Sequence, residues 1–281
     1  MYWMVFLYAL LGLALGSFLN VCIHRLPRGE SIVLPRSRCP QCGSAIAAYD
    51  NIPLLSFLLL RGRCRSCGIR ISLQYPLVEL FTGLACYACA REWSFTPPTF
   101  VNSLLLAIII ALIFIDYHHQ ILPNRLTLPG TALGIGLCRF QAAEFYGDAL
   151  SFRLAAALAP GDPAAMLPWM GSIAGALIGG GILLLVAFLY QIARRRQGLG
   201  MGDVKMMAMV GAFLGWRLAM LIIFIGSALG SIIGILLIMF RGQNLQTKLA
   251  FGTFLGAAAA IALFYGLDFI HWYAASTSSV P

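Results

Sequence analysis

The first 23 residues of the chain, MYWMVFLYALLGLALGSFLNVCI (residues 1–23), form an apolar run without a charged side chain. A helix that crosses a membrane needs roughly 20 predominantly apolar residues. The run is longer than the apolar core of a secretory signal, and its basic residues begin only at Arg25, so we expect it to be retained. It therefore predicts a membrane protein whose first span is residues 1–23.

The composition of the whole chain points the same way. Its 281 residues are 60% hydrophobic and 10% charged, with a mean hydropathy of +0.86. Soluble domains carry about 25% charged residues, so an ordinary water-soluble enzyme is excluded, as are disordered and collagen-like chains. The net charge of +9 could indicate a nucleic-acid partner. Basic loops of membrane proteins more often mark the cytoplasmic side, so we expect a lipid bilayer and no nucleic acid.

Seven further apolar runs follow a polar block. The eight runs together predict an all-α polytopic membrane protein with about eight transmembrane helices. The chain then divides into a first helix (1–23), a cytoplasmic insert (24–74) and a seven-helix membrane domain (75–281). Two runs of about 13 residues are short for a span, and a long mixed loop is expected at 141–168. The seven runs are residues 75–90, 100–115, 126–138, 170–192, 204–216, 218–240 and 250–273.

The lysines and arginines predict the orientation of these spans. Placing the N-terminus outside assigns 15 of the 19 basic residues to the cytoplasmic side and 4 to the outer side. Cytoplasmic loops carry the excess of Lys and Arg, so this orientation is the expected one. The inner set is Arg25, Arg28, Arg36, Arg38, Arg61, Arg63, Arg65, Arg70, Arg125, Arg194, Arg195, Arg196, Lys205, Arg241 and Lys248, and the outer set is Arg91, Arg139, Arg153 and Arg217.

The insert contains two CxxC knuckles, CPQCG and CRSCG, separated by 21 residues. Two thiolates at this spacing grip one side of a tetrahedral Zn²⁺, and a second pair closes the shell. Disulfides are disfavoured on the cytoplasmic side, and two matched knuckles are hard to explain as redox pairs. We therefore predict a structural zinc site formed by Cys39, Cys42, Cys64 and Cys67. The other cysteines, Cys22, Cys86, Cys89 and Cys138, are predicted to be buried apolar side chains.

Acidic residues within or beside spans are costly and often functional. Asp116 ends one apolar run, and Asp203 lies in a glycine-rich loop that enters another. The predicted topology places both at the cytoplasmic edge of the membrane. Two carboxylates that meet there would share a proton, so one could activate water while the other polarises a carbonyl, as in aspartic proteases. The alternative is that each forms an isolated ion pair, Asp203 with Lys205 or Asp116 with Arg125.

Other residues near these acids are weaker candidates. Gly200 and Gly202 would let the backbone and a substrate approach Asp203 closely. Lys205 is also explained as a positive flank of a span. Glu79 is a third acid near a span end, where a simple polar contact would explain it equally well.

Two local patterns have simple interpretations. His118 and His119 follow Asp116 and could bind metal or relay protons, but a polar loop at the membrane surface explains them as well. Gly12 and Gly16 form a GxxxG pattern that permits close helix packing.

Several motifs occur together and in a characteristic order. They are GSFLNV (16–21) leading to RLPR (25–28), the two knuckles, DNIPLLS (50–56), ISLQYPLVE (71–79), ID (115–116) with LPN (122–124), and GMGD (200–203). With these motifs the chain resembles, over nearly its whole length, the bacterial type IV prepilin peptidases, which are bifunctional leader peptidase/N-methyltransferases.

The resemblance implies a polytopic enzyme of the bacterial inner membrane with an aspartic site of the GxGD type. Such enzymes cut pilus prepilins or type II secretion pseudopilins at the cytoplasmic face. They then methylate the new α-amine with S-adenosylmethionine. Asp116 and Asp203 match the catalytic aspartates, and the four cysteines match an insert of the bifunctional members. No S-adenosylmethionine motif is evident, and we expect the insert and adjoining spans to build that site.

The chain departs from the family pattern near its last apolar run. The family often reads Phe-Gly-Pro-Phe there, whereas this chain has Phe-Gly-Thr-Phe at 251–254. We therefore expect a kink to be absent there, but neither aspartate nor the cysteine set is changed.

Three other interpretations fit part of the sequence. In a transporter or channel, Glu79, Asp116 and Asp203 would line an ion pathway, although no internal repeat is evident. A metal-sensing membrane anchor would leave the glycine-rich loop unexplained. A peptidase without methyltransferase activity is disfavoured by the four cysteines, through the resemblance alone.

Overall fold

The computed structural model describes residues 2–195, 198–241 and 250–278, so Arg196 and Lys248 lie outside the described residues. The chain forms two compact units, an N-terminal unit (Met1–Ile115) and a C-terminal unit (Asp116–Pro281). Their boundary falls within helix α4 (Pro97–His119).

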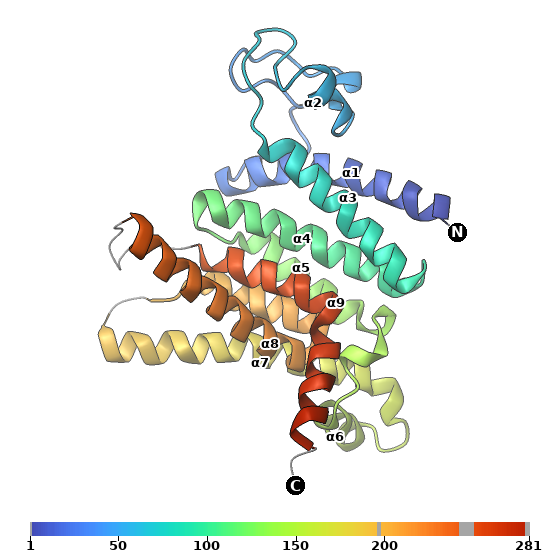
Figure 1. The fold of residues 1–281 in the computed structure, drawn as a ribbon. Helices are drawn as coiled ribbons and strands as arrows, with labels where there is room; N and C mark the ends of the chain where they lie inside the picture. The colour runs from blue at the N-terminus through green and yellow to red at the C-terminus, as the bar shows by residue number, and fades with distance from the viewer. Residues whose placement is uncertain (1, 196–197, 242–249, 279–281) are drawn as a thin grey trace. The chain divides into compact units, whose positions relative to one another are not determined.

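In the N-terminal unit, α1 (Tyr2–Arg25) packs along α3 (Gln74–Trp93) (Figure 1). The contact is close because the facing residues of α1 are small. A Cβ atom on Gly12 would lie 2.8 Å from the Cβ of Cys86, and one on Gly16 would lie 2.6 Å from the Cα of Glu79. The GxxxG pattern therefore forms a helix-packing face, as predicted.

The insert, residues 26–73, connects these two helices (Figure 1). It contains only short elements, namely η1 (Leu26–Arg28), η2 (Ala48–Asn51) and α2 (Leu55–Leu59). Two isolated antiparallel bridges, Arg38↔Ala45 and Arg63↔Arg70, enclose the two knuckles.

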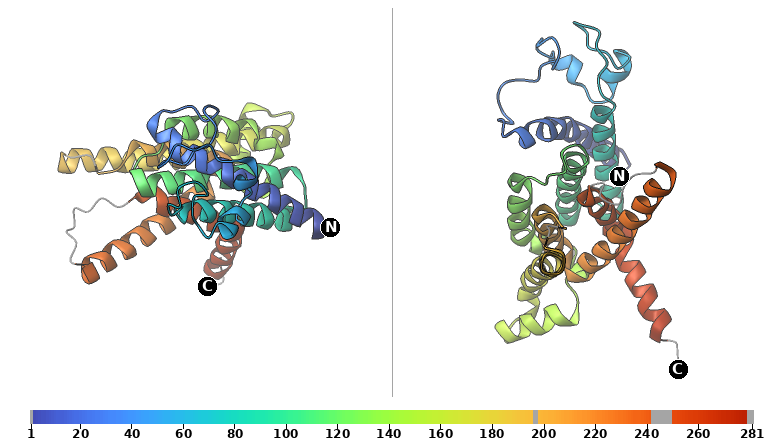
Figure 2. Two further views of the ribbon diagram at one scale, coloured as in Figure 1. Left: turned by 90° about the horizontal axis from the view of Figure 1, so that it is seen from above. Right: turned by 90° about the vertical axis from the view of Figure 1, so that its left-hand side faces the viewer.

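The C-terminal unit is a bundle in which α8 packs along α7 and against α9 (Figures 1 and 2). Gly175 and Gly211 face each other where α7 and α8 meet, and each backbone carbonyl occupies the place of the other residue's Cβ. Glycine thus allows the two helix backbones to touch. The elements are α5 (Asn124–Gly136), η3 (Cys138–Phe140), η4 (Ala143–Phe145), α6 (Ala149–Leu158), α7 (Pro163–Arg194), α8 (Met201–Arg241) and α9 (Phe251–Ser278).

The prediction of a loop at 141–168 is wrong in part, because α6 and the start of α7 lie within it. Both helices begin at an aspartate cap. Asp148 accepts a hydrogen bond from the Ser151 amide at 2.9 Å, and Asp162 accepts one from the Ala165 amide at 3.2 Å.

Helix α8 is broken at Gly215, whose φ of 76° and ψ of 170° are not helical. A break frees backbone carbonyls that a continuous helix would satisfy, and buried carbonyls need partners. Tyr146 donates its hydroxyl to the carbonyls of Ala212 and Phe213, at 2.8 and 2.9 Å. Gln141 donates to Phe213 at 3.2 Å, and Ser172 donates to Ala212 at 2.7 Å. Side chains from elsewhere in the unit thus satisfy the broken end.

All eight predicted runs are largely helical, but a count of eight spans is not confirmed. Runs 204–216 and 218–240 are the two halves of α8. Helix α5 has 13 residues, or about 20 Å, which is short for a span. Helix α3 is less apolar, because it carries charged residues. Five helices within the described ranges are long and apolar enough to cross a membrane: Tyr2–Arg28, Pro97–His119, Pro163–Arg194, Met201–Phe240 and Phe251–Thr277.

Candidate active site and metal centre

Asp116 and Asp203 meet in the C-terminal unit at the start of α9. Asp116 lies in the last turn of α4 and Asp203 in the first turn of α8, and their exposed fractions are 5% and 8%. A Cβ atom on Gly252 would lie 2.9 Å from Oδ2 of Asp116 and 3.1 Å from Oδ1 of Asp203. The two carboxylates therefore border the same small space above Gly252.

Thr253 holds one of the two carboxylates. Its backbone N–H donates to Oδ2 of Asp116 at 2.9 Å, and its hydroxyl donates to the same oxygen at 3.3 Å. Proline has no N–H, so the departure from the Phe-Gly-Pro-Phe pattern provides this chain with a backbone donor at position 253.

Leu122 forms an apolar wall of the same space. Its side chain is 9% exposed, and its Cδ1 would lie 2.9 Å from a Cβ atom on Gly252. A Cβ atom on Gly202 would lie 2.9 Å from the Cβ of Leu122. Gly202 thus lets Leu122 pack close beside Asp203, while Gly200 lies just before α8, where its carbonyl accepts the Asp203 amide at 3.1 Å.

The alternative ion pairs are not formed. Lys205 donates to the side-chain oxygen of Asn124 at 2.8 Å, instead of pairing with Asp203. The ion pair found within the described part of the chain joins Arg65 to Asp50. With no cation bound to either, Asp116 and Asp203 can act as a proton-sharing pair.

The histidines are placed differently from the prediction. His118 and His119 belong to the last turn of α4 and are exposed, whereas a loop was expected. The helix continues beyond the apolar run because the Gln120 amide still bonds to the Asp116 carbonyl, at 2.8 Å.

Glu79 lies in the N-terminal unit, on α3. Its side chain is 8% exposed and accepts a hydrogen bond from the Leu54 amide at 2.9 Å. Leu54 precedes α2 and has a φ of 59°, which is unfavourable for a side chain other than glycine. Glu79 therefore anchors the insert to α3, which is the polar contact that the simpler interpretation expected.

The four cysteines of the insert converge. Their sulfur atoms lie within 4.8 Å of one another, and those of Cys39 and Cys67 are 3.9 Å apart. Zn–S bonds of about 2.3 Å in a tetrahedron place two sulfurs about 3.8 Å apart, so the cluster fits such an ion. Hydrogen bonding with Ser44 lowers the pKa of the Cys42 thiol to about 6, whereas burial and the neighbouring thiols raise the pKa of Cys67 to about 11. The cluster can hold a metal ion such as zinc.

The remaining cysteines are buried, as predicted. All eight cysteines are free thiols. The four outside the cluster are at most 5% exposed: Cys22, Cys86, Cys89 and Cys138.

Sequence reasoning missed two members of the aspartate site and one contact of the insert. In the sequence, Gly252 and Thr253 stood out only because Phe-Gly-Thr-Phe at 251–254 differs from the family's Phe-Gly-Pro-Phe. That difference was the available signal for their part in the aspartate site. The Arg65–Asp50 pair, with contacts of 2.6 and 2.8 Å, had no signal in the spacing.

Two family models match most of the chain. Residues 10–93 match a model described as the bacterial peptidase A24 N-terminal domain, and residues 103–235 match the type IV leader peptidase family. No solved structure matches the chain.

Several curated relatives share the name prepilin leader peptidase/N-methyltransferase. The Myxococcus xanthus protein is 41% identical over 85% of this chain and 64% of its own length. The Aeromonas hydrophila protein is 34% identical over 96% of this chain and 92% of its own length, and the Pseudomonas aeruginosa protein is 35% identical over 92% and 89%. The chain therefore belongs to the type IV leader peptidase family, as an enzyme akin to these prepilin leader peptidase/N-methyltransferases.

Proposed function

We propose that this enzyme cleaves the leader peptide of prepilins or pseudopilins with Asp116 and Asp203 as an aspartic dyad, and then methylates the new N-terminus. The observation that carries the proposal is the placement of both buried carboxylates around one space above Gly252. Gly200 lies just before α8, and Gly202 and Lys205 belong to the first turns of this helix, which presents Asp203.

The hydrogen bonds distinguish the roles of the two aspartates. Donors to a carboxylate oxygen stabilise its charged form, and Thr253 supplies two to Asp116. Asp116 is then the base that removes a proton from the attacking water, and Asp203 is the acid that donates to the scissile carbonyl. Collapse of the tetrahedral intermediate breaks the C–N bond: the leaving amine takes a proton from Asp116, and the hydroxyl that becomes the new carbonyl returns its proton to Asp203.

The proposed topology suits a substrate with a basic leader and an apolar helix. With the N-terminus outside, the insert and the dyad face the cytoplasm of a bacterial inner membrane. The apolar helix would lie in the bilayer, and its junction with the leader would reach the interface where Asp116 and Asp203 lie.

The N-terminal unit would hold both zinc and the methyl donor, S-adenosylmethionine. Zinc is the metal that Cys39, Cys42, Cys64 and Cys67 fit, and its role is structural because four thiolates leave no open position. S-adenosylmethionine supplies the methyl group when it is bound. Glu79 would act as an anchor of the insert.

The test is cleavage of a prepilin-like peptide by the purified full-length protein in detergent. Asp116→Asn and Asp203→Asn keep the side-chain shape but remove the carboxylate, so each should reduce the cleavage rate by about 1,000-fold or more. Asp268→Asn, an exposed position on α9, is the matched control and should cleave normally. Near-normal cleavage by either active-site variant would exclude the dyad.

A further inference from the structure

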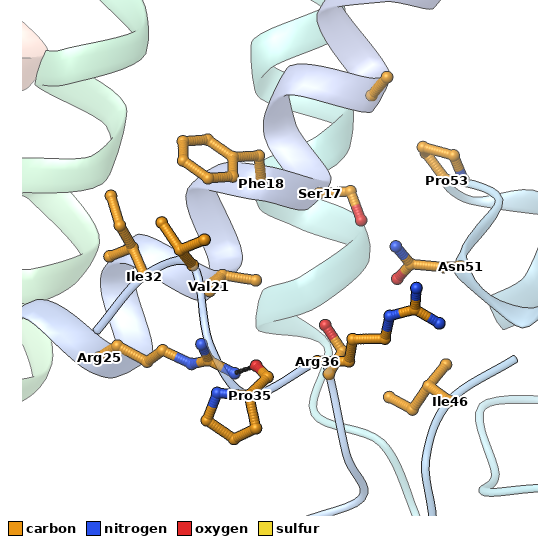
Figure 3. A pocket seen from close by; sticks show the side chains of 13 residues that line it. Ser17, Phe18, Val21, Arg25, Ile32, Pro35, Arg36, Ile46, Asn51 and Pro53 are labelled. Carbon is orange, nitrogen blue, oxygen red and sulfur yellow. Dashed lines mark hydrogen bonds between the residues drawn. The ribbon is translucent and has the colours of Figure 1, made fainter. Parts of the chain in front are cut away.

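A pocket of about 560 Å³ lies in the N-terminal unit, between the C-terminal end of α1 and the insert (Figure 3). Small-molecule sites in proteins commonly have volumes of about 300–1,000 Å³. Phe18, Val21 and Ile32 form an apolar side of the pocket. The size and the apolar side suit a small molecule with a flat, weakly polar ring system.

The opposite side of the pocket is polar. Figure 3 shows the Ser17 hydroxyl, the Asn51 amide and the Arg36 guanidinium gathered there. Arg25 also lines the pocket, but it is bonded to the carbonyls of Ser31 and Pro35, at 2.8 and 2.6 Å. Arg25 is therefore part of the wall, whereas Arg36 can bind an anionic group of a ligand.

The charge on Arg36 is not neutralised by the protein. In residues 2–195, 198–241 and 250–278, the ion pair present is Arg65–Asp50, and Arg36 takes no part in it. A guanidinium in such a position recognises a carboxylate through two parallel hydrogen bonds. Ser17 also hydrogen-bonds to Glu79, a mostly buried carboxylate that could offset a positive charge on a ligand.

The four-cysteine cluster is linked to two residues on the polar side of this pocket. Arg36 lies three residues before Cys39, at the start of the first knuckle. Asn51 follows Asp50, which is bound through both carboxylate oxygens to Arg65 in the second knuckle. Closing the metal site therefore sets the positions of Arg36 and Asn51 together.

We infer that this pocket binds S-adenosylmethionine, the methyl donor; the inference rests on the methyltransferase part of the proposed function. The donor carries a carboxylate, an α-ammonium group, a cationic sulfonium and an adenine ring, and its net charge is positive. Arg36 suits the carboxylate, the apolar side with Phe18 suits the ring, and the amide of Asn51 suits the polar edge of the base. The residues of this chain thus bind and orient the donor, and the metal cluster keeps them in place.

The experiment is equilibrium dialysis of radiolabelled S-adenosylmethionine against the purified full-length, zinc-loaded protein in detergent. Arg36→Ala should weaken binding about tenfold or more, because it removes a charge-assisted bidentate contact. Arg63→Ala removes the same charge from an exposed position of the insert outside the pocket, and it should bind as the wild type does. Zinc content and prepilin cleavage should be unchanged in both variants.

A second variant guards against misfolding of the first. Ile32→Trp fills the pocket from its apolar side and should also abolish binding while cleavage persists. Wild-type affinity in both variants would overturn the pocket and leave methylation standing. Absence of binding and of methylation in the wild type, with cleavage intact, would overturn both the pocket and the methyltransferase half of the proposed function.

Discussion

The two sites of this protein are built by different means. In the C-terminal unit, Asp116 and Asp203 stand on turns of long helices, and their positions are set by helix packing and by Gly252 and Thr253. In the N-terminal unit, the cysteine cluster and the part of the pocket opposite α1 stand on loops with short helices and two isolated bridges. Helix packing therefore fixes the first site, whereas we propose that a bound metal fixes the second.

The insert lacks a core that could hold it by itself. Several of its large apolar side chains are at least 69% exposed: Val33, Leu34, Leu58 and Leu59. Ordering the backbone costs about 1–2 kcal/mol per residue, which burial of so few side chains does not offset. Structural zinc contributes about 10–16 kcal/mol in small zinc-binding peptides, so a bound metal would stabilise the insert.

The largest expected effect comes from removing a cysteine of the four-cysteine cluster. Cys39→Ser should lower bound zinc and reduce methylation about 100-fold or more, while cleavage changes only a few-fold. Metal analysis and paired cleavage and methylation assays test this split. Cys138→Ala, which removes a buried thiol outside the cluster, should affect neither zinc nor methylation. Equal loss of both activities in Cys39→Ser would contradict the independence of the two sites.

The second prediction changes the aspartate site and leaves the cysteine cluster intact. Gly252→Ala would place a methyl group 2.9 and 3.1 Å from the two carboxylates, so the dyad must move apart. We expect cleavage to fall about tenfold or more, with methylation of a pre-cleaved substrate unchanged. Gly181→Ala on α7 meets no atom within 4 Å and serves as the control. Normal cleavage by Gly252→Ala would show that the space above this residue is not used.

A smaller effect is expected from the Arg65–Asp50 contact. The Arg65 guanidinium lowers the pKa of Asp50, so the contact stabilises the insert above the ordinary aspartate pKa of about 3.9 and is lost as the pH falls. Asp50→Asn should therefore make the insert more sensitive to proteolysis at neutral pH, with a difference from the wild type that narrows below about pH 4. Glu30→Gln, an exposed change in the same insert, is the control. A difference that does not depend on pH would exclude the ion pair as its cause.

The smallest effect concerns the donors to Asp116. Thr253→Val removes the hydroxyl but keeps the backbone N–H, so cleavage should fall only about two- to fivefold. Thr253→Ser retains the hydroxyl and should restore the rate. If valine and serine behave alike, the hydroxyl does not contribute to positioning Asp116.

Local patterns in the sequence predicted much of this fold. Apolar runs of sufficient length marked the helices, the GxxxG pattern marked the packing face of α1, and the CxxC spacing marked the cysteine cluster. The number of spans could not be predicted from the apolar runs alone. Gly215 divides α8 into two runs, and α5 is short for a span. Helix α6 was missed because its start depends on the side-chain cap at Asp148.

The details of the aspartate site depend on contacts between distant parts of the chain. The two acids could be paired from the predicted topology, since both fell at one membrane edge. Thr253 could not be assigned to them, because it lies 137 residues from Asp116 and periodicity carries no information on such a contact.

The break in α8 has a consequence for exchanging parts between relatives. Gln141 and Tyr146 belong to the segment before α6, yet they complete the hydrogen bonding of the helix half that ends at Gly215. In a lipid environment no water replaces them, and each unsatisfied carbonyl costs several kcal/mol. This segment is therefore not an interchangeable cassette: a graft that replaced it without its two polar side chains would remove both side-chain donors from the Phe213 carbonyl, more than sixty residues away in sequence.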